Sequence, residues 1–315
     1  MIPKISIAIP AYKSTFLRQA IDSVLAQTFS DWELIIVNDA SPEPVSEIVK
    51  QYMDTRIRYY VNETNIGMED PAVNWNRCLE LAQGEFFCLL CDDDYYEPTF
   101  LEEMLTLADK YPDVSVFRSR IKIVDANNQT LDFFPSSPEW ESGLDYLWHR
   151  ICGFRRQTIS EFLLRRKHIC ALNGYSLLPK AWFADEISIC RFAQTNGISS
   201  INRPLTILRL SLQNISSEKN KYIRQKVEAC NMYIEWIKQF IMREKEEYVQ
   251  VILRNSIDKK RICMAEYLTY APWRDFIFLW THRNTQRYHI YWTCFLKALN
   301  KRIINSGKRY FNEYT

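Results

Sequence analysis

The chain has 315 residues, of which 47% are hydrophobic and 25% charged. This balance is typical of folded soluble proteins and excludes intrinsic disorder, a collagen and a disulfide-dense scaffold. The formal net charge of +2 is unevenly distributed. Residues 216–315 carry 19 Lys and Arg against 10 Asp and Glu, and residues 1–215 carry the remaining 21 Lys and Arg against 28 Asp and Glu. An acidic front part is therefore joined to a basic back part.

Strand-like and helix-like segments alternate through the first 125 residues. Short apolar runs predict strands at 4–10, 32–37, 56–61, 85–90, 114–118 and 122–125. Helical spacing of apolar residues predicts a helix after Ser14, which we expect to cap it, and further helices at 45–53, 71–83 and from Pro98 to about 111. The alternation predicts an α/β fold, with a mostly parallel sheet and helices on both faces.

The pattern changes after residue 125. Residues 126–160 are irregular, strands are predicted at 158–164 and 205–210, and a helix is predicted at 180–195. After Ser216 the spacing is helical almost throughout. We therefore predict an α/β domain over residues 1–215, with halves at about 1–125 and 126–215, and a helical, basic and aromatic-rich region over residues 216–315.

Polar side chains follow the predicted strands where each strand ends. Ligands of open parallel sheets bind beyond these carboxyl ends, which here carry residues 10–12, 38–41, 62–67 and 92–94. The last of these is a run of three aspartates, whose carboxylates repel one another unless a cation or solvent compensates. Carboxylate oxygens suit Mg²⁺ or Mn²⁺ bound with a substrate phosphate. An acidic, solvated loop is the alternative interpretation.

The chain has 7 glycines and no glycine-rich phosphate-binding motif, so a metal ion is the favoured route to any nucleotide. Its 9 cysteines include one C-x-x-C, Cys88 and Cys91, inside an apolar run and without a second metal-ligand pair. Buried thiols in a reducing compartment are the favoured interpretation. The chain starts without a signal-like segment and has no apolar run near 18 residues. We therefore expect a cytoplasmic protein, or one peripheral on the inner face of the cell membrane.

An ordered set of short motifs resembles the family 2 glycosyltransferases. The set consists of ISIAIPAY at 5–12, DSVLAQTF at 22–29, WELIIVNDAS at 32–41, NIG at 65–67, NWNR at 74–77, AQGE at 82–85 and DDD at 92–94 with Pro98, and a second patch lies at 173–175, 184–185 and 209–216. The resemblance implies a GT-A fold and metal-dependent transfer of a sugar from a nucleotide diphosphate, most simply UDP, with inversion. The implied acceptor is a hydroxyl of a glycan or lipid-linked saccharide, in surface polysaccharide biosynthesis.

The resemblance also implies roles for single residues that bind the nucleotide. Tyr12 would stack on the base, and Asp39 would accept a hydrogen bond from a ring N–H, which uracil, thymine and guanine offer. Arg209 would pair with the diphosphate, next to a loop at 211–216 that closes over the nucleotide. The complete nucleotide-binding set is Pro10, Ala11, Tyr12, Asp39, Asn65, Gly67, Asn76, Asp92 and Arg209.

The acidic triplet departs from the family pattern. The family's D-x-D falls on residues 91–93, so its first acidic position is Cys91 and Asp92 would take over the ribose contact. The resemblance then implies Asp93 and Asp94 as ligands of Mn²⁺ or Mg²⁺. Inverting transfer also needs a carboxylate that takes a proton from the acceptor hydroxyl. Asp185 matches that position with Glu186 as the alternate, and a helix-capping role for Asp185 is the competing interpretation.

Residues 271–315 carry eight Lys and Arg against two acidic residues, interleaved with aromatic side chains. This pattern fits either an anionic membrane surface or packing on the catalytic domain or a second subunit, so a homo-oligomer is left open. No nucleic-acid-binding motif is present, and we expect no nucleic-acid partner. Two alternative functions remain: a degenerate nucleotide-sugar-binding subunit, because of Cys91, and a nucleotidyltransferase, which usually has a glycine-rich opening loop.

Overall fold

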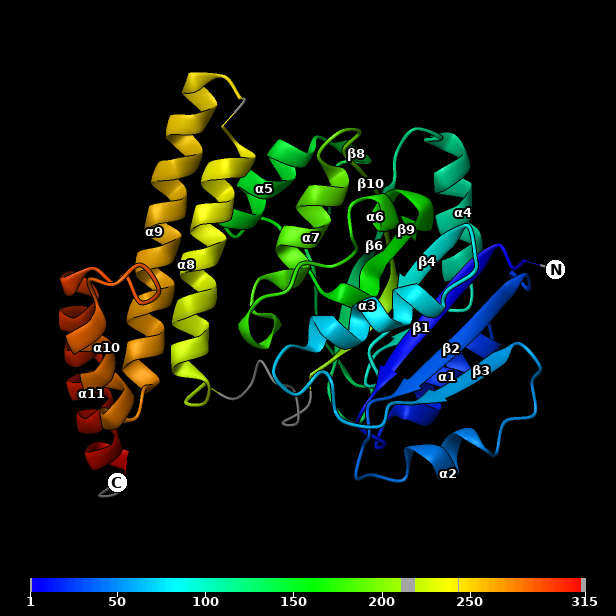
Figure 1. Cartoon of the computed structure of the whole chain (residues 1–315), viewed down its shortest axis with the longest axis horizontal. Coiled ribbons are helices and arrows are strands. Elements are labelled where there is room, and N and C mark those ends of the chain that lie inside the picture. The colour runs from blue at the N-terminus through cyan, green and yellow to red at the C-terminus, as the bar shows by residue number, and fades with distance from the viewer. Residues whose placement is uncertain (1, 211–218, 243, 313–315) are drawn as a thin grey trace. The chain divides into compact units, whose positions relative to one another are not determined.

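The computed structural model describes residues 2–210, 219–242 and 244–312. The chain divides into two compact units. The first comprises Met1–Leu177 and Ala184–Leu212, and the second comprises Leu178–Phe183 and Gln213–Thr315. The prediction placed all of residues 1–215 in the first domain. The short segment Leu178–Phe183 instead belongs with the second unit. Figure 1 shows the mixed α/β first unit in blue to green and the helical second unit in yellow to red.

Four parallel strands form one half of the sheet, in the order β3-β2-β1-β4. They are β1 (Ile5–Ala11), β2 (Trp32–Asn38), β3 (Ile57–Val61) and β4 (Phe86–Leu89). The strands β1, β2 and β4 are almost completely buried because they are covered on both faces, as their near-continuous apolar sequences predict. Parallel pairing brings the carboxyl ends of all four strands to one edge of the sheet.

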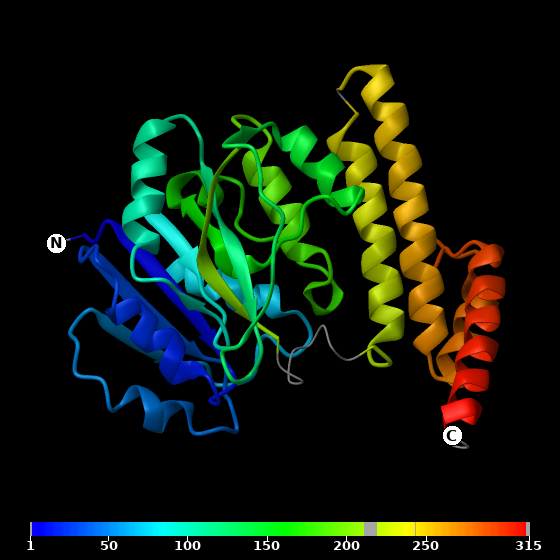
Figure 2. The same ribbon diagram turned by 180° about the vertical axis from the view of Figure 1, so that it is seen from behind.

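Helices cover both faces of this half (Figures 1 and 2). Alternate side chains of β1, β2 and β4 share one apolar core with α1 (Leu17–Leu25), α2 (Val45–Val49) and α4 (Phe100–Lys110). The opposite face contacts α3 (Pro71–Leu81), which begins at the side-chain cap that Asp70 provides. Ser14 is not the cap of α1, contrary to the sequence-based expectation. The cap position is Phe16 without a side-chain hydrogen bond, and the Ser14 hydroxyl donates to Glu43 at 2.7 Å instead.

The other half makes the sheet mixed, whereas the sequence suggested a mostly parallel one. The strand β9 (Phe162–Arg165) pairs antiparallel with both β4 and β6 (Val116–Val124), and β6 pairs parallel with β10 (Ile198–Arg209). The two strands predicted at 114–118 and 122–125 are the single strand β6. Three short strands complete the sheet by antiparallel pairing, namely β5 (Tyr95–Tyr96), β7 (Thr130–Phe133) and β8 (Trp140–Glu141).

Short helices connect these strands. They are α5 (Gly143–Ile151), the 3₁₀ turn η1 (Ile159–Glu161), α6 (Arg166–Ala171) and α7 (Ala184–Ala193). The helix predicted at 180–195 starts only at Ala184. Before it, η2 (Pro179–Ala181) forms a 3₁₀ turn with Lys180 at φ 56°, a left-handed conformation that no α-helix continues through.

The described part of the second unit contains four α-helices in addition to η2. They are α8 (Ile223–Phe240), α9 (Glu246–Tyr270), α10 (Trp273–His282) and α11 (Trp292–Asn312). Side chains of all four meet in one apolar core that includes Val227, Met264, Leu279 and Phe295. Among the described residues, no helix combines the length and the apolar character needed to cross a bilayer.

Candidate active site

The turn after β1 is held by the acidic segment after β4. Asp92 Oδ2 accepts hydrogen bonds from the backbone N–H groups of Tyr12 at 2.8 Å and Lys13 at 2.7 Å. This is possible because β1 and β4 are neighbours in the sheet. Asp92 is buried, and besides the ribose contact predicted for it, it fixes the backbone on which Tyr12 stands. Tyr12 itself is 41% exposed.

Asp39, which follows β2, likewise binds backbone N–H groups of a neighbouring loop. Its Oδ1 accepts from Asn62 Nδ2 at 2.8 Å and from the Ile66 N–H at 2.9 Å, and its Oδ2 accepts from the Gly67 N–H at 2.8 Å. A Cβ on Gly67 would lie 2.8 Å from Asp39 Oδ2, so only glycine allows this approach. A carboxylate has about four lone-pair sites, and three donors leave Asp39 capacity for one more. Asn65 lies in the same loop.

Two other residues of the predicted nucleotide set serve the protein backbone. The Ala11 side chain is completely buried, and its carbonyl accepts from the Asp39 N–H at 3.0 Å. The Asn76 side chain donates to the Tyr175 carbonyl at 2.9 Å and accepts from the Tyr175 N–H at 2.8 Å. Because both polar atoms of Asn76 are bonded to the backbone of Tyr175, Asn76 joins α3 to the Asn173–Tyr175 turn in place of the predicted nucleotide contact. Pro10, next to Ala11, is partly exposed.

Arg209 is completely buried at the end of β10, and the pairing with a diphosphate that the resemblance implies for it stays a prediction. Its guanidinium donates to the Asp93 carbonyl at 3.2 Å, the Asp125 carbonyl at 2.9 Å and the Gln19 side chain at 2.6 Å, and it lies 4.1 Å from the Phe16 ring centre. Arg209 therefore fixes the backbone of the acidic loop at the Asp93 carbonyl. The loop at 211–216, predicted to close over the nucleotide, lies outside the described residues.

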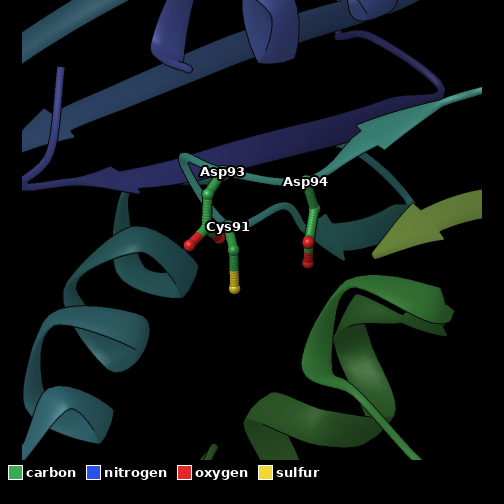
Figure 3. Close-up of side chains that lie close together, drawn as sticks. All are labelled: Cys91, Asp93 and Asp94. Carbon is green, nitrogen blue, oxygen red and sulfur yellow. The ribbon is translucent and has the colours of Figure 1, made fainter. Parts of the chain in front are cut away.

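The residues after β4 form a compact set of ligand atoms. Cys91, Asp93 and Asp94 point to the same side of their loop, and one ligand atom of each lies within 4.8 Å of the others (Figure 3). Asp94 is buried, accepts from the Ser160 hydroxyl at 2.6 Å and accepts from the Arg209 N–H at 3.1 Å. Asp93 is more open, and its Oδ2 lies 3.5 Å from Lys13 Nζ.

The electrostatics of this set favour a bound cation. Burial, with the neighbouring Asp93 carboxylate, raises the pKa of Asp94 to about 8 and that of Asp92 to about 6. Two carboxylates and a thiol within reach of one another are a donor set that a divalent metal ion accepts, and Mn²⁺ or Mg²⁺ is the ion that the oxygen donors suit. The oxygen donors of Asp93 and Asp94 therefore fit a divalent cation, whereas burial raises the pKa of the Cys91 thiol and makes it a weak ligand beside them.

Asp185 lies in the first turn of α7, with its side chain partly exposed. Its Oδ2 accepts a hydrogen bond from Gln157 Nε2 at 3.0 Å, and the Oε1 of the same Gln157 accepts from the Tyr146 hydroxyl at 2.6 Å. Burial raises the pKa of Asp185, and the charge of Arg150 opposes the rise. A carboxylate with raised proton affinity and a fixed direction has the properties of a general base.

Glu186, the alternate base, is held in the protein interior. It is 2% exposed, and its Oε2 lies 2.5 Å from Arg150 Nη2. A buried carboxylate bonded to an arginine has little access to a substrate proton. The two adjacent acids therefore have different surroundings, and Asp185 is the more accessible of the two.

The 3₁₀ turn η1 contacts the acidic loop after β4. The Ser160 hydroxyl donates to Asp94, and the next residue, Glu161, is completely buried with its Oε1 2.7 Å from Arg118 Nη2. Burial raises the pKa of Glu161 to about 7, and the nearby Asp185 contributes to the rise. Sequence reasoning missed Gln157, Ser160 and Glu161, because a strand was expected at 158–164 and Gln157 stands in the irregular stretch before it. Their only signal was a group of polar residues before an apolar run.

Comparisons with known proteins identify the class. The family model described as "Glycosyl transferase family 2" matches residues 6–167, which is half of the chain. The chain therefore belongs to glycosyltransferase family 2, and its α/β sheet with flanking helices is the GT-A fold.

Relatives are similar over part of their length. The uncharacterized glycosyltransferase RT0329 of Rickettsia typhi is 33% identical over 42% of this chain and 40% of that protein. TuaG of Bacillus subtilis, a glycosyltransferase named for teichuronic acid biosynthesis, is 31% identical over 48% of this chain and 60% of that protein. The matches thus span 40% to 60% of the length of these two relatives.

Solved structures share the fold over nearly the whole chain. S. aureus TarS 1–349, solved in complex with UDP-GlcNAc, superimposes with a TM-score of 0.67 over 95% of this chain and 89% of that chain at 16% identity. The mannosyltransferase PcManGT of Pyrobaculum calidifontis, in complex with GDP-Man and Mn²⁺, gives a TM-score of 0.53 over 96% of this chain and 88% of that chain at 14% identity. At these identities the likeness shows the fold.

Proposed function

We propose that the protein is a metal-dependent inverting glycosyltransferase that moves a sugar from a nucleotide diphosphate to a hydroxyl of a glycan or lipid-linked saccharide, in polysaccharide biosynthesis. The observation that carries the proposal is the short segment from Gln157 to Ser160. Ser160 donates to Asp94 of the acidic loop at 2.6 Å, and Gln157, three residues earlier, donates to the candidate base Asp185 at 3.0 Å. One short segment thus contacts both the proposed metal–diphosphate site and the proposed proton acceptor, which supports transfer between two substrates held close together.

The donor nucleotide is proposed to bind at the carboxyl ends of β1 and β2. The exposed ring of Tyr12 would stack on the base, supported by the backbone bonds from its N–H and that of Lys13 to Asp92. Asp39, with one acceptor site left after three hydrogen bonds, would receive a ring N–H. Uracil, thymine and guanine have such a group, and UDP is the proposed carrier because the similar TarS was solved with UDP-GlcNAc.

Asp185 is proposed to accept the acceptor hydroxyl proton. The acceptor oxygen attacks the anomeric carbon on the face opposite the diphosphate, a new C–O bond forms, and the bond to the diphosphate oxygen breaks with its electron pair leaving on the diphosphate. Gln157 and Tyr146 keep the Asp185 carboxylate aimed, since the bonds that join them are 3.0 Å and 2.6 Å long. The position of Lys13, 3.5 Å from Asp93, places a cation where the diphosphate charge would collect.

Asp93 and Asp94, with Cys91 beside them, would hold the Mn²⁺ or Mg²⁺ ion. Such an ion, when bound, binds diphosphate oxygens and stabilises the charge that develops on the leaving group. The chain's own contribution is to fix the ligands, because Ser160 holds the Asp94 carboxylate and Arg209 holds the Asp93 carbonyl from behind.

A screen of nucleotide sugars tests the proposal. Thermal unfolding of the full chain is measured with UDP-, GDP- and dTDP-sugars, with and without Mn²⁺, and release of free nucleotide is followed in parallel. We expect one nucleotide class to raise the unfolding temperature only with metal present, and nucleotide to be released in the presence of an acceptor extract. Binding without any turnover would favour the non-catalytic nucleotide-sugar-binding subunit.

A further inference from the structure

The helices α10 and α11 expose a large apolar surface in the second unit. On α10, Trp273, Ile277 and Trp280 are 59%, 59% and 42% exposed, and their spacing of four and three residues puts them on one side of the helix. On α11, Trp292, Leu296 and Ile303 are 59%, 54% and 71% exposed at spacings of four and seven. Single exposed apolar residues are ordinary, but aligned sets on two paired helices mark an interaction site.

Both apolar sides border the same junction between the helices. The Trp280 ring lies 5.0 Å from that of Phe295, and the Arg302 guanidinium lies 4.7 Å from the Trp273 ring centre. The helices are therefore antiparallel neighbours, and the exposed residues next to Phe295 and Arg302 in sequence, Leu296 and Ile303, flank the junction. We call the six exposed residues, Trp273, Ile277, Trp280, Trp292, Leu296 and Ile303, the Trp face.

Core packing and hydrogen bonds hold the two helices that carry the Trp face. Phe276 and Leu279 of α10 and Phe295 of α11 point the other way, into the core of the unit. The Arg302 side chain donates to the carbonyl of Leu268 at 2.6 Å and to that of Ala271, at the end of α9. This bond set attaches α11 to the α9–α10 corner, so the exposed rings are presented by packed helices and not by a loop.

Positive charge surrounds the Trp face. Arg274, Lys297 and Lys301 are exposed, and none of them forms an ion pair with another described residue. The single acidic residue between positions 271 and 305, Asp275, is already bonded to Arg224 at 2.7 Å. Two copies joined through this face would bring like charges together, which is unfavourable. A negatively charged surface would neutralise them.

We propose that the Trp face docks the protein on the surface of a membrane that contains anionic lipid. Indole rings suit the level of the lipid headgroups because they combine an apolar ring with a polar N–H. The aliphatic side chains Ile277, Leu296 and Ile303 insert just below that level, and the surrounding Arg and Lys side chains contact the phosphates. Such docking would confine the transferase to a surface, which suits a lipid-linked acceptor.

Flotation of the full chain with vesicles tests this proposal. Phosphatidylcholine vesicles are compared with vesicles that also contain phosphatidylglycerol, at low and high salt. One variant combines Ile277→Ser, Leu296→Ser and Ile303→Ser, and a second combines Arg274→Gln, Lys297→Gln and Lys301→Gln. Met242→Ser, which removes an apolar side chain that is 71% exposed at the α8–α9 turn, is the matched control. Near-ultraviolet circular dichroism of each variant verifies the fold.

We expect the unmodified chain and the Met242→Ser variant to float with phosphatidylglycerol vesicles and not with phosphatidylcholine alone. Binding should fall about fivefold for each cation removed, fall as salt rises and disappear in the triple serine variant. Equal flotation with both vesicle types, or none with either, would overturn the proposal. A stable dimer in light scattering that the serine variant abolishes, without vesicle binding, would assign the face to a second copy instead. None of these readouts depends on transferase activity.

Discussion

Gln157 Nε2 donates a 3.0 Å hydrogen bond to Oδ2 of Asp185, while Gln157 Oε1 accepts a 2.6 Å bond from the Tyr146 hydroxyl. The amide is held at both ends, so the Asp185 carboxylate is fixed in direction by a neutral partner. The same bond lowers the pKa of Asp185, against the burial that raises it. Gln157 therefore controls both the aim and the proton affinity of the proposed base.

Replacing Gln157 by leucine is expected to shift the pH dependence of transfer. A general base acts in its deprotonated form, so a higher pKa moves the acidic limb of kcat/KM to higher pH. Gln157→Leu removes a bond that lowers the pKa of Asp185, and we expect the limb to move upward and the rate at neutral pH to fall about tenfold. Gln51→Leu, which alters an exposed glutamine bonded to the Glu47 carbonyl, is the control. A lower rate with an unmoved pH profile would show that Gln157 has only a structural role.

Asp185→Asn is expected to abolish transfer and to leave nucleotide binding largely intact. The substitution keeps the size of the side chain but removes the proton acceptor, which costs about 10²- to 10⁴-fold in rate. Asp145→Asn is the matched control, because Asp145 also lies in the first turn of a helix, α5, and bonds its cap residue Ser142 at 2.8 Å. Full transfer activity in Asp185→Asn would refute the assignment of the base.

Asp93→Asn is expected to weaken nucleotide binding only in the presence of metal. Loss of one charged metal ligand should reduce the Mn²⁺-dependent affinity for the nucleotide about tenfold or more. Residues that only hydrogen-bond to metal ligands already change metal affinity by that much. Calorimetric titration of the nucleotide, with and without Mn²⁺, measures the effect. Asp109→Asn, at an exposed position on α4, controls for the loss of one negative charge. An equal loss with and without metal would contradict the ligand role.

Arg209→Gln is expected to destabilise the fold. Its guanidinium bonds the Asp93 and Asp125 carbonyls and the Gln19 side chain in a completely buried place, and a shorter side chain leaves these oxygens without a donor. We expect a loss of about 3 kcal/mol in the free energy of unfolding, measured as a lower melting temperature. Arg203→Gln, whose side chain is 66% exposed, should change stability little. If Arg209→Gln melted normally but lost diphosphate affinity, the role inferred from sequence would stand.

The sequence predicted the elements whose signals are local. Strands β1, β2, β3 and β4 appear within about two residues of their predicted positions. The strands β1, β2 and β4 are short apolar runs buried on both faces of the sheet, and β3 is a short run rich in β-branched and aromatic residues between turn signals. The family was also predictable from ordered motifs, and the family model confirms it over residues 6–167. Where the pattern was weak, prediction failed: residues 114–125 gave two expected strands in place of one, because the polar residues between them lie within the continuous strand β6.

Roles that depend on distant partners were not predictable. Asp185 and Glu186 are adjacent and chemically alike, yet Glu186 is paired with Arg150, 36 positions earlier in the chain, and Asp185 with Gln157. Asn76 and Arg209 were expected among the nucleotide-binding residues because both match positions of the family's motifs. The structure instead directs Asn76 to the backbone of Tyr175 and Arg209 to carbonyls of the acidic loop.

The class of fold, the family and the division into an acidic part and a basic helical part could all be predicted from the sequence. They follow from periodicity, motif order and charge, which are properties of neighbours along the chain. Three further features became visible only in the folded chain. Asp92 holds the Tyr12–Lys13 turn, the segment from Gln157 to Ser160 contacts both Asp185 and Asp94, and six apolar side chains lie exposed on α10 and α11. These features depend on hydrogen bonds and burial that join residues far apart in the chain, and the order of residues does not show which of them come into contact.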